Sequence, residues 1–139
     1  MKQKSGDICI STSGRDLIDV TRQISRWVAQ SGISEGVLTV FIQHSSASLT
    51  IQENADPDVQ LDLQDFYAEL VPEGHQLYRH SAEGADDMPA HIKSSLTDVS
   101  LTIPILQGAL RLGTWQGIYV FEHRARPHHR NLALHIMGE

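Results

Sequence analysis

The chain has 139 residues, of which 40% are apolar and 20% charged, the composition of an ordinary globular protein. This length predicts one domain over residues 1–139 with a substantial apolar core. The net charge of −6 argues against broad nucleic-acid binding, which depends on Lys and Arg side chains that neutralise phosphates. No apolar run approaches the ~20 residues that a membrane span requires. We therefore expect neither nucleic acid nor a membrane as a partner.

Cysteine and histidine usage narrows the expected chemistry. Cys9 is the only cysteine, which excludes an internal disulfide and predicts an inert buried thiol in a strand. No apolar stretch follows the first seven residues, so they do not resemble a signal peptide, and a cytoplasmic location is the default expectation. The chain has eight histidines, whose imidazoles bind metals and exchange protons near neutral pH. The one concentration of basic residues, Arg124, Arg126 and Arg130, suits a single phosphate or carboxylate better than a polymer.

Three helices are expected, all before the last part of the chain. Apolar residues at helical spacing predict one over 15–31, which ends at a glycine. An acid at the N-cap and a proline at the first helical position predict a second over 56–70. A short third helix is expected over 89–96, capped by Asp86 or Asp87. The predicted buried face of the second helix consists of Val59, Leu63, Phe66 and Leu70.

Short strands are expected throughout, and they dominate the end of the chain. Alternating or β-branched residues predict strands over 7–13, 37–43, 48–52, 100–105, 109–112, 117–122 and 131–137. A polar stretch over 75–87 is expected to lack regular structure. Short strands joined by tight turns favour an α+β fold with antiparallel or mixed sheets over a doubly wound parallel sheet. No glycine-rich phosphate loop of the usual spacing occurs, so a nucleotide-binding fold is disfavoured.

The densest group of chemically versatile side chains runs from His80 to His91. Two histidines and three acids, Glu83, Asp86 and Asp87, lie within twelve residues. A loop histidine and a helix histidine can converge on one metal, with an acid orienting a ring from behind. The simpler alternative is that the aspartates cap a helix and the histidines are surface residues. We favour a functional site because polar loops are where such sites concentrate, and we predict His80 and His91 as metal ligands and Asp87 as catalytic.

A histidine and small hydroxyl residues follow the strand over 37–43. Ser45 and Ser46 beside His44 offer hydrogen-bond donors to an anion without blocking its access, and we predict that they bind substrate. His44 is predicted as a third metal ligand or as an acid/base, the alternative being a strand-end histidine satisfied by a backbone carbonyl. A Ser-His-acid triad is disfavoured because neighbouring strand side chains point to opposite faces. Asn54 is expected either to bind substrate or to help cap the following helix.

The third group of candidates flanks the strand over 117–122. Glu122 and Arg124 share a face by alternation, so they either form a structural ion pair or orient a phosphate beside a general base. We predict Glu122 as catalytic and Arg124 as substrate-binding. The turn before the strand, with Thr114, Trp115 and Gln116, is also predicted to contact substrate. The alternative for the tryptophan is a place in the core.

Several of these segments together resemble the YjbQ-like family, also described as secondary thiamine-phosphate synthases. The matching segments, in the family's order, are 44–49, 53–57, 83–93, 113–118 and 122–124. Two positions depart from the family pattern: Ser45 stands where threonine is usual, and Gln52 where asparagine is usual. The resemblance implies α+β proteins with two packed, mostly antiparallel sheets and about three helices, which assemble as homotrimers. It also implies a divalent-metal site at positions matching His80, His91 and His44.

The activity that the resemblance implies is thiamine-phosphate synthesis, in which a pyrimidine diphosphate is joined to a thiazole phosphate and pyrophosphate is released. Loss of pyrophosphate requires charge stabilisation at the leaving oxygens, which a divalent metal and Arg124 could supply. Histidine ligands suit zinc, whereas diphosphate chemistry normally uses magnesium bound by oxygen, so both metals stay open. Two alternatives remain: a metal-dependent hydrolase or transferase acting on another small phosphorylated molecule, and a non-catalytic trimer that binds a ligand.

Overall fold

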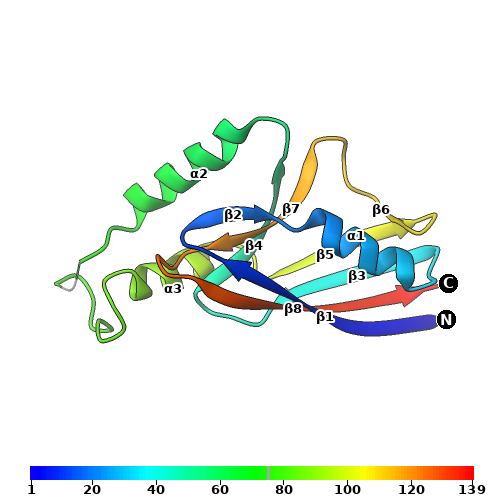
Figure 1. Cartoon of the computed structure of the whole chain (residues 1–139), viewed down its shortest axis with the longest axis horizontal. Helices are drawn as coiled ribbons and strands as arrows, with labels where there is room; N and C mark the ends of the chain where they lie inside the picture. The colour runs from blue at the N-terminus through cyan, green and yellow to red at the C-terminus, as the bar shows by residue number, and fades with distance from the viewer. Residues whose placement is uncertain (75) are drawn as a thin grey trace.

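The computed structural model describes residues 1–74 and 76–139, and their strands form two antiparallel sheets (Figure 1). The larger sheet has the strand order β1-β8-β3-β5-β6 and the smaller β2-β7-β4. The strands are β1 (Lys2–Thr12), β2 (Asp16–Asp19), β3 (Glu35–Ile42), β4 (Ala47–Glu53), β5 (Ser100–Leu106), β6 (Ala109–Leu110), β7 (Gln116–Glu122) and β8 (His128–Gly138). The helices are α1 (Thr21–Gln30), α2 (Pro57–Leu70) and α3 (Asp87–Leu96). The expected α+β fold with two mostly antiparallel sheets is confirmed. Of the predicted polar stretch over 75–87, His75 lies outside the described residues.

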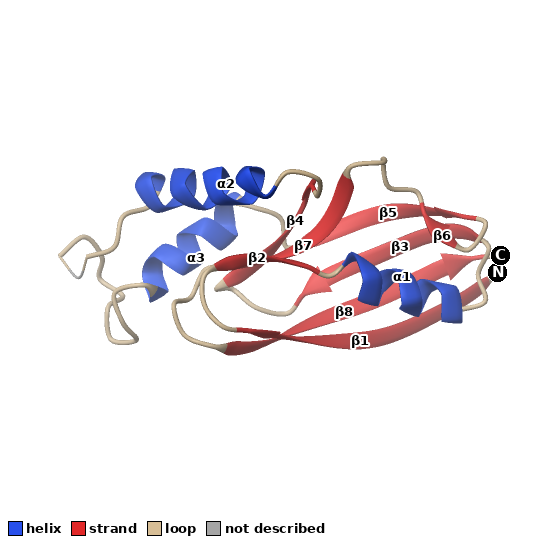
Figure 2. Cartoon of the chain, turned by 45° about the horizontal axis from the view of Figure 1, so that its top comes forward, coloured by secondary structure: helices blue, strands red, loops and turns tan. Residues whose placement is uncertain are grey.

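The apolar core lies between the two sheets. Figure 2 shows α1 and the smaller sheet over one face of the larger sheet, with α2 and α3 at the end of the molecule away from both termini. In β3 the alternating residues Leu38, Val40 and Ile42 point into the core and are at most 1% exposed. This alternation follows from the two-residue period of a strand. No helix in the described part of the chain is long and apolar enough to cross a membrane.

Two neighbouring strands of the larger sheet, β1 and β8, are longer than the sequence pattern indicated. β1 and β8 pair along their whole lengths, from Lys2 opposite Gly138 to Thr12 opposite His128. Within β1, Ile10 is buried while Cys9 is exposed. The prediction of a buried thiol is therefore wrong, because adjacent strand residues face opposite sides of the sheet and Cys9 lies on the outer side.

The predicted helix over 15–31 is two elements. Its first residues form β2, in which Leu17 and Ile18 pair with Phe121 and Val120 of β7. The helix α1 starts only at Thr21, whose backbone N–H and hydroxyl both donate to the Asp19 carboxylate, at 2.9 Å and 2.6 Å. The apolar residues of β2 happen to fit a helical spacing. Pairing with β7 overrides this local pattern and makes the segment a strand.

Helix α2 begins as predicted, but only part of its predicted buried face packs against the protein. The Asp56 carboxylate accepts a hydrogen bond from the backbone N–H of Asp58 at 3.0 Å, as an N-cap does. However, Phe66 and Leu70 of the predicted buried face are 58% and 54% exposed. The helix contacts the smaller sheet through Leu63, as predicted, and through Tyr67, whose ring meets Phe121 edge-on with centroids 5.5 Å apart. The apolar spacing predicts too wide a buried face, because α2 contacts the rest of the protein along one narrow side.

A buried ion pair ties the end of β7 to β8. The Glu122 carboxylate is 0% exposed and accepts hydrogen bonds from Arg130 Nε at 2.8 Å and Nη2 at 2.5 Å. Thr12 of β1 donates to the same carboxylate at 2.6 Å. Because both charges are desolvated, each depends on the other for its compensation.

We predict that breaking this pair destabilises the fold strongly. Glu122→Gln leaves the Arg130 guanidinium buried without its anion, which costs about 3–5 kcal/mol of unfolding free energy in urea titrations. Glu35→Gln, which removes an exposed acid of β3, is the matched control and should change stability little. The double variant Glu122→Gln/Arg130→Met should lose less than the sum of the two single losses. Additive losses would show that the two groups are not coupled.

Candidate metal centre

Four side chains with metal-binding atoms converge where the loop before α3 meets the helix. His80 and Glu83 come from the loop, and Asp87 and His91 from the first turns of α3. The helix starts at Asp87, two residues earlier than predicted, so Asp87 and His91 are four residues apart and share one helix face. One ligand atom from each of the four residues lies within 4.8 Å of the others. The predicted convergence of His80, His91 and Asp87 is thus present in the geometry.

The spacing of these atoms fits a small divalent cation. His91 Nε2 lies 3.2 Å from Asp87 Oδ2, and His80 Nε2 lies 3.4 Å from Glu83 Oε2. Tetrahedral ligands with bonds of 2.0–2.1 Å stand about 3.4 Å apart, so both separations match such a site. His80 Nε2 and Asp87 Oδ2 are closer, at 2.5 Å, because they share a hydrogen bond. The set of two imidazoles and two carboxylates suits zinc or a similar transition metal better than magnesium.

Contacts behind two of the four residues, His91 and Asp87, fix the direction of their ligand atoms. His91 Nδ1 lies 2.8 Å from the carbonyl oxygen of Ser45, which leaves Nε2 facing the cluster. Asp87 is 2% exposed, and its Oδ1 accepts a hydrogen bond from Arg124 Nη1 at 2.5 Å while Oδ2 faces the histidines. Metal sites in proteins depend on such outer contacts, since they set the tautomer and the orientation of each ligand.

The charges in the cluster support one another. Burial opposes ionisation of Asp87, but hydrogen bonds from His80 and the Arg124 charge outweigh it and lower the pKa of Asp87. The hydrogen bond to Asp87 in turn raises the pKa of His80. Asp86 is similar: burial is outweighed by the backbone N–H of Ala125 and by Arg124, so its pKa is also lowered. Two carboxylates are therefore held ionised beside the candidate site.

Arg124 serves the cluster and does not pair with Glu122 as the alternation indicated. Its Nε donates to Asp86 at 2.9 Å, its Nη1 to Asp87, and its Nη2 to the carbonyl of Glu83 at 3.0 Å. Its backbone N–H, in contrast, donates to the Glu122 carboxylate at 3.2 Å. β7 ends at Glu122, so the strand alternation does not continue to Arg124, and the two charges find different partners.

His44 lies outside the four converging residues. Its Nε2 accepts a hydrogen bond from the backbone N–H of Asn131 at 2.8 Å. This matches the alternative of a strand-end histidine bonded to the backbone, except that the partner is an N–H and not a carbonyl. Burial lowers the pKa of His44, and the Arg130 charge lowers it further. Ser45 and Ser46 contribute through their carbonyl oxygens, which accept from His91 and Arg130. The structure therefore brings this segment to the edge of the cluster while leaving the His44 ring on Asn131.

The turn before β7 is far from the cluster within one chain. Trp115 is 63% exposed, so it is not a core residue, and its carbonyl accepts the backbone N–H of Asn54 at 2.9 Å. Asn54 therefore lies beside Trp115, with Thr114 and Gln116 on the same turn. This turn stands at the start of β7 and Arg124 just beyond its end, so a strand of about 20 Å separates them (Figure 1).

An open groove of about 530 Å³ adjoins the cluster on its solvent side. Its cationic or titratable lining groups are Arg124, Arg126 and His128, and Glu83 of the cluster also borders it. Arg130, the third arginine of the basic concentration, is buried against Glu122 instead. Positive charge beside a candidate metal site is suited to a phosphate group.

Two residues on the other side of α3 were not recognised as functional in the sequence. Lys93 is 5% exposed, and His123 is 1% exposed with its Nε2 2.8 Å from Ser48 Oγ. Burial, with a smaller effect of the Lys93 charge, lowers the pKa of His123 to about 3. Burial also lowers the pKa of Lys93, followed by the effect of Arg15. Lys93 belongs to the 83–93 segment of the family resemblance, which was the only signal that could have singled it out.

Several known proteins are similar to this chain over most of its length. A sequence model of the family described as UPF0047 protein YjbQ-like matches residues 7–139. The chain belongs to the UPF0047 YjbQ-like family. It is 53% identical to the UPF0047 protein sll1880 of Synechocystis over 138 residues, which cover 99% of this chain and 94% of that relative. It is 41% identical to the UPF0047 protein YjbQ of Escherichia coli O157:H7, with 95% and 96% of the two chains covered. The family resemblance of the sequence is confirmed.

Solved structures of the family confirm the fold of this YjbQ-like chain. A Clostridium acetobutylicum protein of the YjbQ/UPF0047 family, described as uncharacterized, has a TM-score of 0.86 at 38% identity, with 95% of this chain and 99% of that chain covered. The hypothetical protein APE1520 of Aeropyrum pernix has a TM-score of 0.88 at 28% identity, with 98% and 99% covered.

We predict that this YjbQ-like chain binds one divalent transition metal through the four-residue cluster. His80→Ala and His91→Ala should each weaken zinc binding by at least about tenfold in competition with a chromophoric chelator, because each removes a ligand atom. His135→Ala, on β8 beside Ser5, is the matched control. His44→Ala should bind zinc as the wild type does if each chain forms its own site. Equal affinity of all four variants would contradict the assignment.

A second prediction concerns acid stability and His123. A buried neutral histidine whose folded pKa is about 3 stays unprotonated when the unfolded chain takes up a proton below about pH 6.5, so stability falls as the pH falls through this window. Between about pH 7 and about pH 5, the wild type should lose about 2 kcal/mol more unfolding free energy than His123→Gln. His135→Gln is the control and should follow the wild type. A parallel pH dependence of wild type and His123→Gln would exclude this role for His123.

Proposed function

We propose that the chain is a metal-dependent enzyme that acts on a small phosphorylated molecule at the His80–Glu83–Asp87–His91 cluster. The observation that carries the proposal is the convergence of four ligand atoms on one point, with Asp87 anchored from behind by Arg124. Metal-ligating carboxylates and histidines are commonly held by such outer contacts.

The basic groove supports a phosphorylated substrate. Arg126 and His128 line the groove beside Glu83, and neither is enclosed by the protein. Three of the five N–H donors of Arg124 are used within the protein, so its other donors are available to an anion at the groove. A phosphate in the groove would therefore meet positive charge next to the candidate metal ligands.

Each group of the chain has a defined part in this proposal. The Ser45 carbonyl orients His91, and Arg124 holds Asp87 ionised and in place. Glu83 is the most solvent-exposed of the four, with its side chain 64% exposed, and is the member best placed to receive a proton from a substrate or water. A divalent cation bound here would stabilise negative charge on phosphate oxygens.

The first reaction to test is the thiamine-phosphate synthesis that the family resemblance implies. In that transfer the bond from the pyrimidine methylene carbon to the diphosphate oxygen breaks, pyrophosphate leaves with the bonding electrons, and the thiazole nitrogen bonds to that carbon. Arg126 and His128 would stabilise the charge on the leaving pyrophosphate. Hydrolysis of another phosphate ester at the same cluster is the alternative that the same geometry supports.

The homotrimer that the resemblance implies remains a prediction, and it bears on Asn54, Thr114, Trp115 and Gln116. These four residues lie at the far end of β7 from the cluster, so in this proposal they contact substrate only as part of a neighbouring copy. Glu122 is fully buried and committed to Arg130, which favours a role in holding the site over direct proton transfer.

We predict that Asp87→Asn lowers turnover at least about 10-fold, because it replaces a charged ligand of the cluster that Arg124 holds in place. Turnover is measured as pyrophosphate release from the pyrimidine diphosphate with thiazole phosphate, and as phosphate release from a panel of monoesters, with zinc or magnesium added. Asp62→Asn on α2 is the matched control for an exposed acid.

The outcomes separate the alternatives. Pyrophosphate release that is lost in Asp87→Asn supports the transferase, and phosphate release with the same dependence supports the hydrolase. Turnover that survives both Asp87→Asn and metal chelation would overturn the metal-dependent site. Tight zinc binding without turnover of any substrate would leave the non-catalytic ligand-binding protein as the correct alternative.

A further inference from the structure

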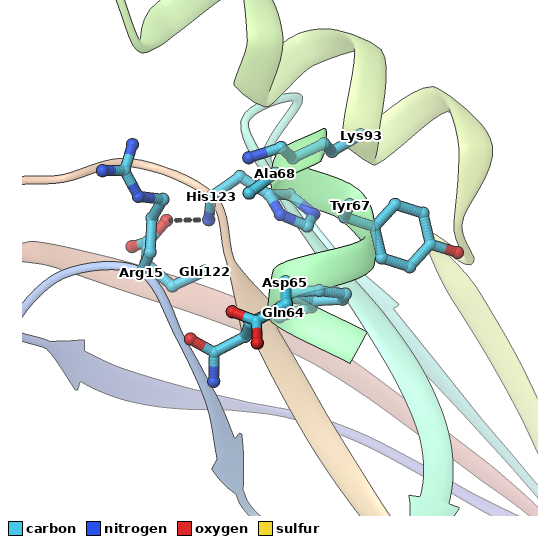
Figure 3. Close-up of a pocket in the computed structure, with 9 residues that line it drawn as sticks. Arg15, Gln64, Asp65, Tyr67, Ala68, Lys93, Glu122 and His123 are labelled. Carbon is cyan, nitrogen blue, oxygen red and sulfur yellow. Dashed lines mark hydrogen bonds between the residues drawn. The ribbon is translucent and has the colours of Figure 1, made fainter. Parts of the chain in front are cut away.

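We propose a second binding site in this chain, a cavity at Lys93 that takes the phosphate group of one small organic phosphate. The cavity has a volume of about 200 Å³ and lies between α2, α3 and the end of β7. Figure 3 shows Lys93 extending across the cavity beside His123, with Arg15 on the far side. The site is separate from the metal centre and does not depend on the function proposed there.

The buried ammonium group of Lys93 is the feature that indicates an anionic ligand. The residue is 5% exposed, yet among the described residues none forms an ion pair or accepts a hydrogen bond from its Nζ. The other buried cations of the chain, Arg124 and Arg130, both pair with carboxylates. A buried cation is stable when an anion compensates it, so the cavity in front of Lys93 is the place for one.

The acids around the cavity do not compensate Lys93. Glu122 lines it, but its carboxylate is held by Arg130. Glu73 pairs with the Arg15 guanidinium. Asp65 also lines the cavity and is exposed on α2. None of these acids forms an ion pair with Lys93 among the described residues, so Lys93 is the cation that faces the cavity without compensation, beside the paired Arg15.

The remaining walls indicate what the anion carries. Tyr67, Ala68 and Phe121 give the cavity an apolar side, and Gln64 adds an amide. His123 is neutral because of its low pKa, so it adds a polar edge without charge. The volume lies below that of usual drug-sized pockets, which favours one small ring or chain bearing one phosphate over a nucleotide.

The position of Lys93 on α3 separates the two sites. Lys93 lies two residues after His91, and at 3.6 residues per turn the two side chains leave the helix on roughly opposite sides. The metal cluster thus occupies one side of α3 and the cavity the other. The cavity lining includes none of the four metal-cluster residues.

The test uses the full-length chain as purified and phenyl phosphate as the probe. Titration calorimetry should show binding to the wild type that weakens about tenfold or more in Lys93→Met, because a charge-assisted hydrogen bond is lost while the side-chain length is kept. Arg15→Gln should weaken binding less, since Arg15 is partly exposed. Lys2→Met is the matched control, and His91→Ala should bind the probe as the wild type does.

A measurement on the wild type keeps the test independent of how the variants fold. Phenyl phosphate should slow acetylation of Lys93 relative to Lys2, read by peptide mass spectrometry. Inorganic phosphate should protect Lys93 less, because it lacks a ring to contact Tyr67 and Phe121. Absence of protection, or equal affinity of wild type and Lys93→Met, would overturn the proposal. Binding lost in His91→Ala and kept in Lys93→Met would assign the phosphate to the metal centre and also overturn it.

Discussion

The carboxylate of Glu122 lies fully buried at the end of β7 and accepts five hydrogen bonds, two from Arg130, one from Thr12 and two from the backbone N–H groups of His123 and Arg124. These contacts join β1, β7 and β8 at one point and fix the direction in which the chain leaves β7. That direction carries Arg124 to Asp86 and Asp87 on α3. Burial of the charge opposes its ionisation, but Arg130 and Thr12 outweigh it and keep the pKa of Glu122 low.

Helix α3 is the element on which both candidate sites are built. On one side, Asp87 and His91 meet the loop residues His80 and Glu83. On the other, Lys93 faces a cavity against α2 and the smaller sheet. Arg124 holds the start of this helix, so the helix can present the cluster residues and Lys93 with fixed geometry. Binding and catalysis require such fixed positions of the side chains that contact a ligand. The two sites therefore share a support without sharing a residue.

Much of the fold followed from local patterns, and the failures have specific causes. The alternation in β3 and the Asp56-Pro57 helix start were read correctly because local residues alone decide them. β2 was mistaken for the start of α1, and Phe66 for a buried residue, because pairing with β7 and the one-sided packing of α2 decide those features. In the site, the spacing of His80, Asp87 and His91 was sufficient to predict their convergence. No local pattern singled out Lys93, because its burial depends on how α3 packs against α2 and β7.

The sequence by itself determined the α+β class, the family and the place of the His80–His91 cluster, since these depend on residue types and on spacings within short segments. Only the tertiary structure decided which charges pair: Arg130 with Glu122, and Arg124 with Asp86 and Asp87. It also showed that His44 lies outside the cluster, bonded to Asn131, and that the Trp115 turn lies beside Asn54 at the far end of β7. Pairing and burial depend on which segments lie side by side, and segments far apart in the sequence carry no local signal of that contact.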